Sequence, residues 1–183
     1  DRQGLSLGEG AAALLLMSAA RAEREKRNRL GTICGWGVTN DANHITAPVR
    51  GGAGLALAVG KALASARKSP QEIAAVGAHG TGTVYNDRME LDAFQKVFDP
   101  RRLPVFSVKG AIGHTLAAAG GIETAIGLKA LAHNVAPPTI GFVNPEEGAE
   151  GQVSADKQTI TGDFLLTTNS GFGGINAALV LGR

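Results

Sequence analysis

Short apolar runs alternate with longer segments of helical periodicity along most of this chain, and this alternation constrains its fold more than any other feature. The expected strands share a run of apolar or β-forming residues, and they cover residues 11–17, 32–38, 73–78, 104–108, 163–169 and 175–181. The expected helices share a helical spacing of apolar or charged residues, and they cover residues 18–28, 51–67, 88–98 and 114–133. This order predicts a layered α/β domain with a mixed sheet, parallel in its first part and antiparallel near its end.

One of these helices is unusual because it is apolar around nearly its whole circumference. Residues 114–133 read "HTLAAAGGIETAIGLKALAH". A helix of this composition is buried on all sides rather than along one stripe. We therefore expect it at the centre of the molecule, with a second sheet covering the side that this chain's own sheet leaves open.

Composition excludes several classes of partner. The chain has 183 residues, enough for one domain with a real core, and a net charge of +2 with no basic stripe among its few aromatic residues, so nucleic acid is not expected. No apolar run approaches the roughly 20 residues of a membrane span, and no signal peptide opens the chain. A single cysteine, Cys34, excludes an internal disulfide and favours a reducing, cytoplasmic compartment.

Polar loops follow several of the expected strands at their carboxyl ends, where ligand sites of α/β folds lie. Glycines in these loops let the backbone approach a ligand closely. The loops contain His79, Thr81 and Thr83 in the first, Lys109 and His114 in the second, and the turn "NSGFGG" at 169–174 in the third. The sequence therefore predicts a site where these three loops meet.

The second loop suggests a specific chemistry. Lys109 and His114 flank two glycines where the apolar helix is expected to begin. The positive end of a helix dipole and a nearby ammonium both disfavour imidazolium, and a neutral imidazole can donate a hydrogen bond to a developing oxyanion. A buried core role for His114 fits the pattern equally well. For Asp87 and Glu90, at the start of the next helix, helix capping and a supporting site role are equally compatible with the pattern.

Other common sites do not fit. "GTGT" lacks the Gly-Lys-Ser/Thr of a phosphate loop, "GFGG" lacks dinucleotide-binding spacing, and the four histidines have no metal-ligand spacing with Cys34. We therefore expect no metal and no prosthetic group. Cys34 lies in an apolar strand and is expected to be an inert core thiol, and capping explains His133. His44 either lines a pocket or is exposed.

Taken together, five segments carry a resemblance over nearly the whole chain. "DRQGLSLGEGA", "DANHITAP", "AHGTGT…D..E", "SVKGAIGHTLAAAGGIE" and "SGFGGIN" follow one another with the order and spacing of the β-ketoacyl-acyl carrier protein synthases, which the chain resembles. The resemblance implies a thiolase-like fold, in which two similar α/β/α halves share a layer of buried helices. Residues 29–183 would be the carboxyl-terminal half, and residues 1–28 the tail of the amino-terminal half.

The resemblance also implies an activity, the decarboxylative Claisen condensation of acyl and malonyl thioesters in fatty acid or polyketide synthesis. In this family a cysteine takes the acyl group, and two histidines help decarboxylate the malonyl group and stabilise the enolate. By motif, His79 and His114 would be these histidines. Lys109 would tune and orient them, Glu123 would be the acidic residue on the buried helix, and Asp87 would be a supporting residue.

The same resemblance implies how substrates are presented. Thr81 and Thr83 would contact the phosphopantetheine arm of acyl carrier protein. Thr46 and His44 would border the tunnel that this arm enters. The partners implied are acyl carrier protein, the amino-terminal half of the synthase and a second subunit in a homo- or heterodimer.

Two departures from the family pattern stand out. The nucleophilic cysteine belongs to the half that precedes this chain, and Cys34 does not match its motif. We therefore expect this chain to be a fragment, or to rely on a partner chain, and to form no acyl-enzyme alone. The closing motif Asn-Ser-Phe-Gly-Phe-Gly-Gly reads Thr168 to Gly174 here, so Ser170 replaces the phenylalanine that gates the acyl pocket, while Phe172 keeps the second. Gating and chain-length preference are expected to differ accordingly.

Two other functions share part of this pattern. A non-catalytic subunit of the chain-length-factor type would shape a partner's tunnel, but such subunits tend to lose the histidines, and this chain keeps His79, Lys109 and His114. A degradative thiolase shares the fold, but "HGTGT" and "KGAIGH" are not its motifs. Both comparisons favour the synthase.

Overall fold

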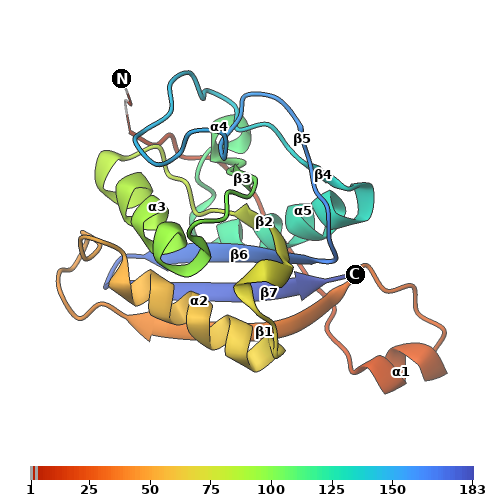
Figure 1. The fold of residues 1–183 in the computed structure, drawn as a ribbon. Coiled ribbons are helices and arrows are strands. Elements are labelled where there is room, and N and C mark those ends of the chain that lie inside the picture. Colours follow the sequence, from red (N-terminus) through yellow and green to blue (C-terminus); the bar gives the residue numbers. More distant parts are fainter. Residues whose placement is uncertain (1, 3) are drawn as a thin grey trace.

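The computed structural model describes residues 2 and 4–183, which form a five-stranded mixed sheet covered by helices (Figure 1). The strands lie in the order β1-β7-β6-β2-β3. Their bounds are Thr32–Asn40 for β1, Ile73–Gly77 for β2, Val105–Phe106 for β3, Phe164–Gly171 for β6 and Ile175–Gly182 for β7. β2 pairs in parallel with β3 and β6, whereas β7 pairs antiparallel with β6 and β1. The predicted mixed α/β sheet is confirmed.

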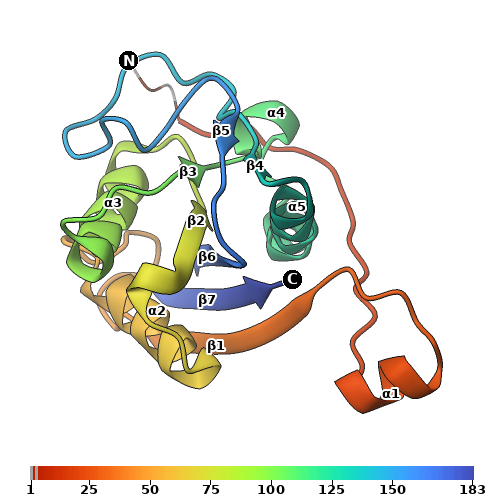
Figure 2. The same ribbon diagram turned by 45° about the vertical axis from the view of Figure 1, so that its right-hand side comes forward.

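Helices lie on both faces of this sheet (Figure 2). α2 (Ala53–Ala66) and α3 (Val84–Phe98) cover one face, and α5 (Ala119–His133) lies against β6 and β7 on the other. α2 approaches β1 closely because β1 carries glycines on that side: a Cβ at Gly37 would lie only 2.1 Å from the Ala58 carbonyl oxygen. Two clusters of buried aliphatic and aromatic side chains fill the space between the sheet and its helices.

The turn before β2 contains a capping box. The short 3₁₀ helix η1 (Pro70–Glu72) follows Ser69, and the Glu72 carboxylate accepts a hydrogen bond of 2.9 Å from the Ser69 backbone N–H. This capping box fixes the entry of the chain into β2. β2 is buried at every position, and it delivers His79 to the end of the sheet.

The expected strand at residues 11–17 is wrong for this structure. The segment is extended but forms no strand, and the Leu15 side chain is 80% exposed. A strand needs a neighbour for its backbone N–H and C=O groups, and no strand of the described residues lies beside it. The helix expected over 18–28 is reduced to α1 (Ala19–Arg24), which stands apart from the sheet (Figure 1).

The expected helix at 114–133 is also different in structure. α4 (Lys109–Ile112) ends at Gly113, η2 (Leu116–Ala118) follows, and α5 begins only at Ala119. Six of the 15 residues of α5 are buried, so the helix is not wholly buried as expected. It contacts this chain's sheet along one side only. Within the described residues no second sheet covers its other side, and β4 (Val135–Ala136) with β5 (Gln158–Thr159) forms only a small two-stranded sheet beyond its end.

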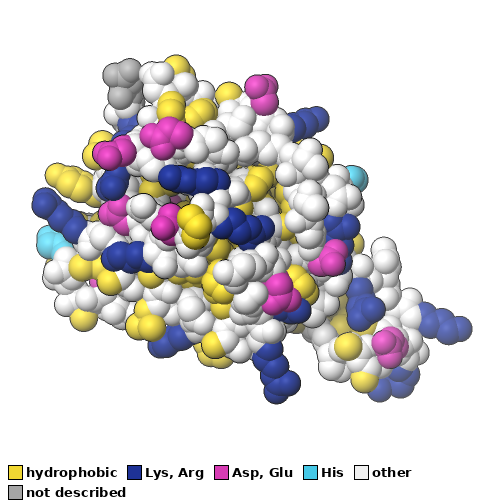
Figure 3. All heavy atoms as spheres, viewed as in Figure 1, with side chains coloured by type: hydrophobic (Ala, Val, Ile, Leu, Met, Phe, Trp, Pro, Cys, Tyr) yellow, Lys and Arg dark blue, Asp and Glu magenta, His cyan; other side chains and the backbone are white. Residues whose placement is uncertain are grey.

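The surface agrees with the charge pattern of the sequence. On the face shown in Figure 3, Lys and Arg side chains are interspersed with Asp and Glu and do not form a stripe of one sign. Among the described residues, no helix has both the length and the apolar composition needed to cross a bilayer.

Candidate active site

Three loops converge at the carboxyl ends of β2, β3 and β6, as the sequence predicts. β2 and β3 are parallel neighbours, so the loops that follow them leave the sheet at the same edge. These loops carry His79 and Lys109, and β6 brings Asn169 to the same place from the other side of β2. Parallel pairing therefore gathers residues that are far apart in the sequence.

Lys109 is the centre of this cluster. Its buried ammonium donates hydrogen bonds to His79 Nδ1 at 3.2 Å, to the His79 carbonyl oxygen and to Glu123 Oε1. An ammonium has three donors and no acceptor, so these contacts satisfy it completely. The second Glu123 oxygen accepts a hydrogen bond of 2.9 Å from Asn169 Nδ2. The predicted association of His79, Lys109 and Glu123 is present.

His114 lies directly beside His79. The ring centroids are 5.2 Å apart, and the planes are inclined by 82°, which is an edge-to-face arrangement. His114 lies in the loop between α4 and η2, so the sequence-based placement at the start of the long helix is wrong. Its position is fixed instead by the amino-terminal segment: the His114 N–H donates to the Ser6 carbonyl at 2.7 Å, and the Gly8 N–H donates to the His114 carbonyl at 3.1 Å.

Both imidazoles are held in the neutral state. Burial lowers the pKa of His79 to about 3, and the charges of Lys109 and His114 act in the same direction. Burial and then the Lys109 charge also lower the pKa of His114. These shifts favour the neutral imidazole expected from the sequence; burial is the main cause, and the expected ammonium of Lys109 adds to it.

The tautomer of each ring follows from its Nδ1 partner. His79 Nδ1 faces the Lys109 ammonium, and His114 Nδ1 accepts a hydrogen bond of 3.1 Å from the Leu116 N–H. Both Nδ1 atoms therefore act as acceptors, so the proton of each neutral ring is on Nε2. Two Nε2–H donors in one place form an arrangement that can stabilise a negatively charged oxygen.

Glu90 is a supporting residue whose role the sequence left undecided. Its fully buried carboxylate accepts hydrogen bonds from the backbone N–H of His79 at 2.8 Å and of Gly80 at 2.7 Å. The side chains of Asn86 and Thr168 also donate to it. Burial raises the pKa of Glu90 to about 7, against the effect of these hydrogen bonds. Its position in α3, one turn before the buried Ala93 and Phe94, is the sequence signal that places it inside.

The rest of the first loop is braced by Asp87. Asp87 Oδ1 accepts a hydrogen bond of 3.2 Å from the Gly82 N–H, and Oδ2 pairs with the Arg2 guanidinium at 3.2 Å. Burial raises the pKa of Asp87, while Arg2 opposes that shift. Thr81 and Thr83 share a hydrogen bond of 2.8 Å between their hydroxyl groups. Asp87 thus supports the loop that carries both threonines.

The remaining predicted residues lie beside the histidine cluster, where the turn between β6 and β7 meets the loop after β1. We call this meeting point the rim. Phe172, in the turn between β6 and β7, is 77% exposed, and the adjacent Gly173 N–H donates to the Ile45 carbonyl at 2.6 Å. This contact joins the turn to the loop of His44 and Thr46. His44 is exposed, and its Nδ1 accepts from the Thr46 N–H at 3.1 Å.

Ser170 does not point into open space at this rim. Its hydroxyl donates to Asn176 Oδ1 at 2.8 Å, and Asn176 Nδ2 donates to Asp41 Oδ1 at 2.8 Å. Asp41 Oδ2 in turn accepts from the Val49 N–H at 2.9 Å. The serine is therefore part of a hydrogen-bonded connection between the turn and the loop that follows β1.

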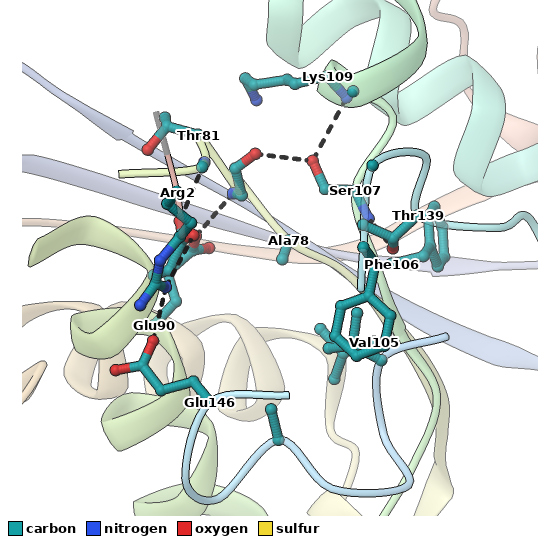
Figure 4. A pocket seen from close by; sticks show the side chains of 18 of the residues that line it. Arg2, Ala78, Thr81, Glu90, Val105, Phe106, Ser107, Lys109, Thr139 and Glu146 are labelled. Carbon is teal, nitrogen blue, oxygen red and sulfur yellow. Dashed lines mark hydrogen bonds and ion pairs between the residues drawn. The ribbon is translucent and has the colours of Figure 1, made fainter. Parts of the chain in front are cut away.

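A cavity of about 650 Å³ adjoins the cluster (Figure 4). Its wall combines the first loop with Ser107, Lys109, Arg2 and the segment at residues 139–149. The Ser107 hydroxyl donates to the Gly80 carbonyl at 2.9 Å and so joins the two loops. His79 and His114 do not line this cavity, so it is a neighbour of the imidazole pair rather than the place where a reacting carbonyl would meet both rings.

The sequence predicts neither metal ligation nor thiol chemistry, and the described residues are consistent with both expectations. The described residues contain no group of three His, Cys, Asp or Glu side chains placed to hold a metal ion. Cys34 lies in β1, packs against the main core, and has its thiol pKa raised by burial. A raised thiol pKa disfavours the nucleophilic thiolate, which agrees with the inert core role predicted for it.

Comparison with known proteins gives a consistent answer. A family model described as "Beta-ketoacyl synthase, C-terminal domain" matches residues 30–143. The 3-oxoacyl-[acyl-carrier-protein] synthase 2 of Coxiella burnetii is 36% identical over 100% of this chain and 45% of its own length. The solved ishigamide ketosynthase/chain length factor has a TM-score of 0.94 at 32% identity, over 100% of this chain and 45% of that one.

A third match is a complex. The structure described as AntDE:AntF, a type II acyl-carrier protein with its ketosynthase bound to the hexaketide, has a TM-score of 0.86 at 27% identity, over 91% of this chain and 41% of that one. The chain thus spans less than half the length of the relatives it matches. The family match, the shared thiolase-like fold and the imidazole pair agree, and the chain belongs to the β-ketoacyl synthase family, whose C-terminal domain it contains.

Proposed function

We propose that this chain is the catalytic carboxyl-terminal half of a β-ketoacyl-acyl carrier protein synthase. In this proposal residues 29–183 form that half, and residues 1–28 are the tail of the amino-terminal half. The reaction joins an acyl thioester to a malonyl thioester with loss of carbon dioxide, in fatty acid or polyketide synthesis. The activity belongs to the assembled protein, because the nucleophilic cysteine is not among the residues of this chain.

The observation that carries the proposal is the pair of Nε2–H donors on His79 and His114. In the decarboxylation step, the bond between the malonyl Cα and its carboxylate breaks, and the electron pair moves onto the thioester as an enolate. The two Nε2–H groups would donate to the enolate oxygen. Because both rings are already neutral and oriented, they would stabilise this charge without reorganising.

Condensation would follow in the same place. The enolate Cα attacks the acyl carbonyl on the cysteine of the other half, the new carbon–carbon bond forms, and the thiolate leaves. The Lys109 ammonium keeps His79 Nδ1 unprotonated and places a positive charge near the developing anion. Glu123 neutralises that ammonium and prevents its charge from being left unpaired in a buried site.

Acyl carrier protein would deliver both substrates on its phosphopantetheine arm. Thr81 and Thr83 carry hydroxyl groups on the first loop, and these hydroxyls are hydrogen-bonded to each other. They could instead form hydrogen bonds with the amide groups of the arm. The rim formed by Thr46, His44 and Phe172 would border the entry, and Ser170 would hold that rim through Asn176. Small residues between His79 and Thr83 leave room for a long, thin thioester.

The assembled protein would be a homo- or heterodimer in the cytoplasm, with no prosthetic group. A chain-length-factor role is the alternative, because the matched structures include ketosynthase/chain length factor pairs. The intact His79, Lys109 and His114 favour the catalytic role. A glutamine in place of the nucleophilic cysteine in the preceding half would favour the alternative.

The deciding experiment measures carbon dioxide release from malonyl-acyl carrier protein by the assembled synthase. His79→Ala and His114→Ala should each abolish release, because each removes one donor to the enolate oxygen. His133→Ala is the matched control, since His133 is exposed at the far end of α5. Release that is unchanged in His114→Ala would contradict the proposed function.

A further inference from the structure

Asn169 binds Glu123 but has no role in the mechanism proposed above. It lies near the end of β6, where neighbouring side chains point to opposite faces of the sheet. Thr168 points to the α3 side and donates to Glu90, whereas Asn169 points to the α5 side and donates to Glu123. The end of β6 therefore reaches both carboxylates that support the site.

The orientation of the Asn169 amide follows from its partner. A carboxylate only accepts hydrogen bonds, so the amide nitrogen faces Glu123 Oε2, at 2.9 Å. The amide oxygen then faces away from Glu123. Asn169 also opposes the lowering of the His79 pKa that burial and Lys109 cause.

We propose that Asn169 is a positioning residue of the synthase: its amide nitrogen holds the Glu123 carboxylate, so that the Lys109 ammonium stays on His79 Nδ1. This inference rests on the proposed function. Glu123 uses one oxygen for Lys109 and the other for Asn169, which fixes the carboxylate plane and therefore the direction of the ammonium. The His79 Nε2–H is then left for the substrate.

A neutral amide suits this position because of the charges that surround His79. Lys109 faces the ring from α4, His114 faces it from the following loop, and Glu123 acts through Lys109 from α5. Glu90, from α3, binds the His79 backbone N–H. An amide binds Glu123 without adding charge to this cluster, whereas a carboxylate would repel Glu123 and favour imidazolium.

The first test replaces the amide by a carboxylate of the same shape. In histidine-labelled Asn169→Asp protein, followed by NMR from pH 4 to 8, the pKa of His79 should rise by about 2 units or more, because a second carboxylate repels Glu123 and adds a negative charge to the cluster around the ring. Asn28→Asp is the matched control, since Asn28 is exposed and far from the site, and it should leave His79 unchanged. A His79 ring that is still neutral at pH 5 in Asn169→Asp would overturn the proposal.

The second test removes the whole amide group. It tests the positioning role even if the Asn169→Asp protein fails to fold. In Asn169→Ala, with Asn28→Ala as control, the ¹⁵N shifts of His79 should change from a single Nε2–H tautomer to a mixture. In the assembled synthase, kcat for malonyl decarboxylation should fall about tenfold to a hundredfold while KM stays within about twofold, as expected for a misplaced donor.

The two readouts separate this inference from the proposed function. A synthase that releases no carbon dioxide even before substitution would contradict the proposed function, while the His79 shifts would still test the role of Asn169. A single Nε2–H tautomer and an unchanged kcat in Asn169→Ala would overturn the positioning role and leave the proposed function intact.

Discussion

Lys109 and Glu123 form an ion pair with side chains that are only 5% and 6% exposed. Burying two charges costs free energy, and their attraction repays it only when hydrogen bonds satisfy the remaining atoms. Here His79 and Asn169 supply those hydrogen bonds. The pair is therefore part of the site's structure as well as its electrostatics.

Breaking this pair should destabilise the fold more than removing it entirely. We expect Lys109→Met or Glu123→Gln alone to lower the free energy of unfolding by about 3–5 kcal/mol, because each leaves a buried charge unpaired. The double variant should lose clearly less than the sum of the single losses. Urea unfolding of the four proteins, followed by circular dichroism, measures this coupling.

The exposed pair of Lys68 and Glu72 provides a matched comparison. Its N–O distance is 2.9 Å, but its side chains are 27% and 41% exposed. The same substitutions there should change the free energy of unfolding much less, because solvent screens an exposed pair. Equal coupling at the two pairs would show that burial of Lys109 and Glu123 has no energetic effect.

The sequence predicts the position of the site well, because this position follows from the parallel pairing of two strands. Parallel strands end at the same edge, so the loops after β2 and β3 had to meet, and these loops carry His79 and Lys109. Helical periodicity also gives α2 and most of α3, because their apolar stripes face a single sheet.

The sequence predicts secondary structure poorly where the structure depends on contacts with segments that lie far away in the sequence. Residues 11–17 have the composition of a buried strand, but no strand of the described chain pairs with them. Leu116, with a φ of +52°, interrupts the helix expected from His114 onward, and a leucine gives no sequence signal for such an interruption. The role of Asn169 depends on which face of β6 it occupies, which only the register decides.

Ser170 gives a prediction about product length. Ser170→Phe in the assembled synthase should shift the acyl-chain preference, because it places an aromatic ring at the rim and breaks the hydrogen bond to Asn176. Mass spectrometry of the products from a series of acyl-carrier substrates measures the shift.

A second variant at the same position separates the two causes. Ser170→Ala breaks the hydrogen bond to Asn176 without adding a ring. If the ring is responsible, Ser170→Ala should keep the original product profile. An identical profile in Ser170→Phe would show that this position does not influence chain length.

Glu90 and His79 should have opposite effects on acid stability. Between pH 4.5 and 6.5 the unfolded chain binds a proton at His79 that the folded chain excludes, so this group makes stability rise with pH. In the same range the folded chain keeps a proton on Glu90 that the unfolded chain loses, so this group makes stability fall with pH. The two slopes therefore largely cancel.

Glu90→Gln should remove one of these slopes and reveal the other. The free energy of unfolding should then rise with pH between 4.5 and 6.5 by up to about 1.4 kcal/mol per pH unit more than in the parent. Urea unfolding at several pH values measures it. Glu147→Gln, at an exposed carboxylate, is the control and should leave the slope unchanged. A parallel pH profile for Glu90→Gln would mean that Glu90 is ionised in the folded protein throughout this range.

The outer face of β1 should make this chain self-associate when it is studied alone. Gly35 and Gly37 face α2, so Trp36 and Val38 lie on the opposite side of the strand, where the Trp36 side chain is 63% exposed. α5 lies on that same side of the sheet and leaves β1 uncovered (Figure 2). In the proposed synthase, the amino-terminal half would cover this surface. Alone, the chain should bind a hydrophobic dye and elute as oligomers, since apolar patches of this kind drive association.

Trp36→Lys should reduce both dye binding and oligomer formation, because it places a charge at the centre of the exposed face. Leu57→Lys is the matched control: Leu57 is 56% exposed on α2, on the other side of the sheet, and its replacement should change association far less. Light scattering coupled to size exclusion measures the difference. A monodisperse monomer that binds no dye would contradict this prediction. It would show that the outer face of β1 does not have to be buried against the amino-terminal half.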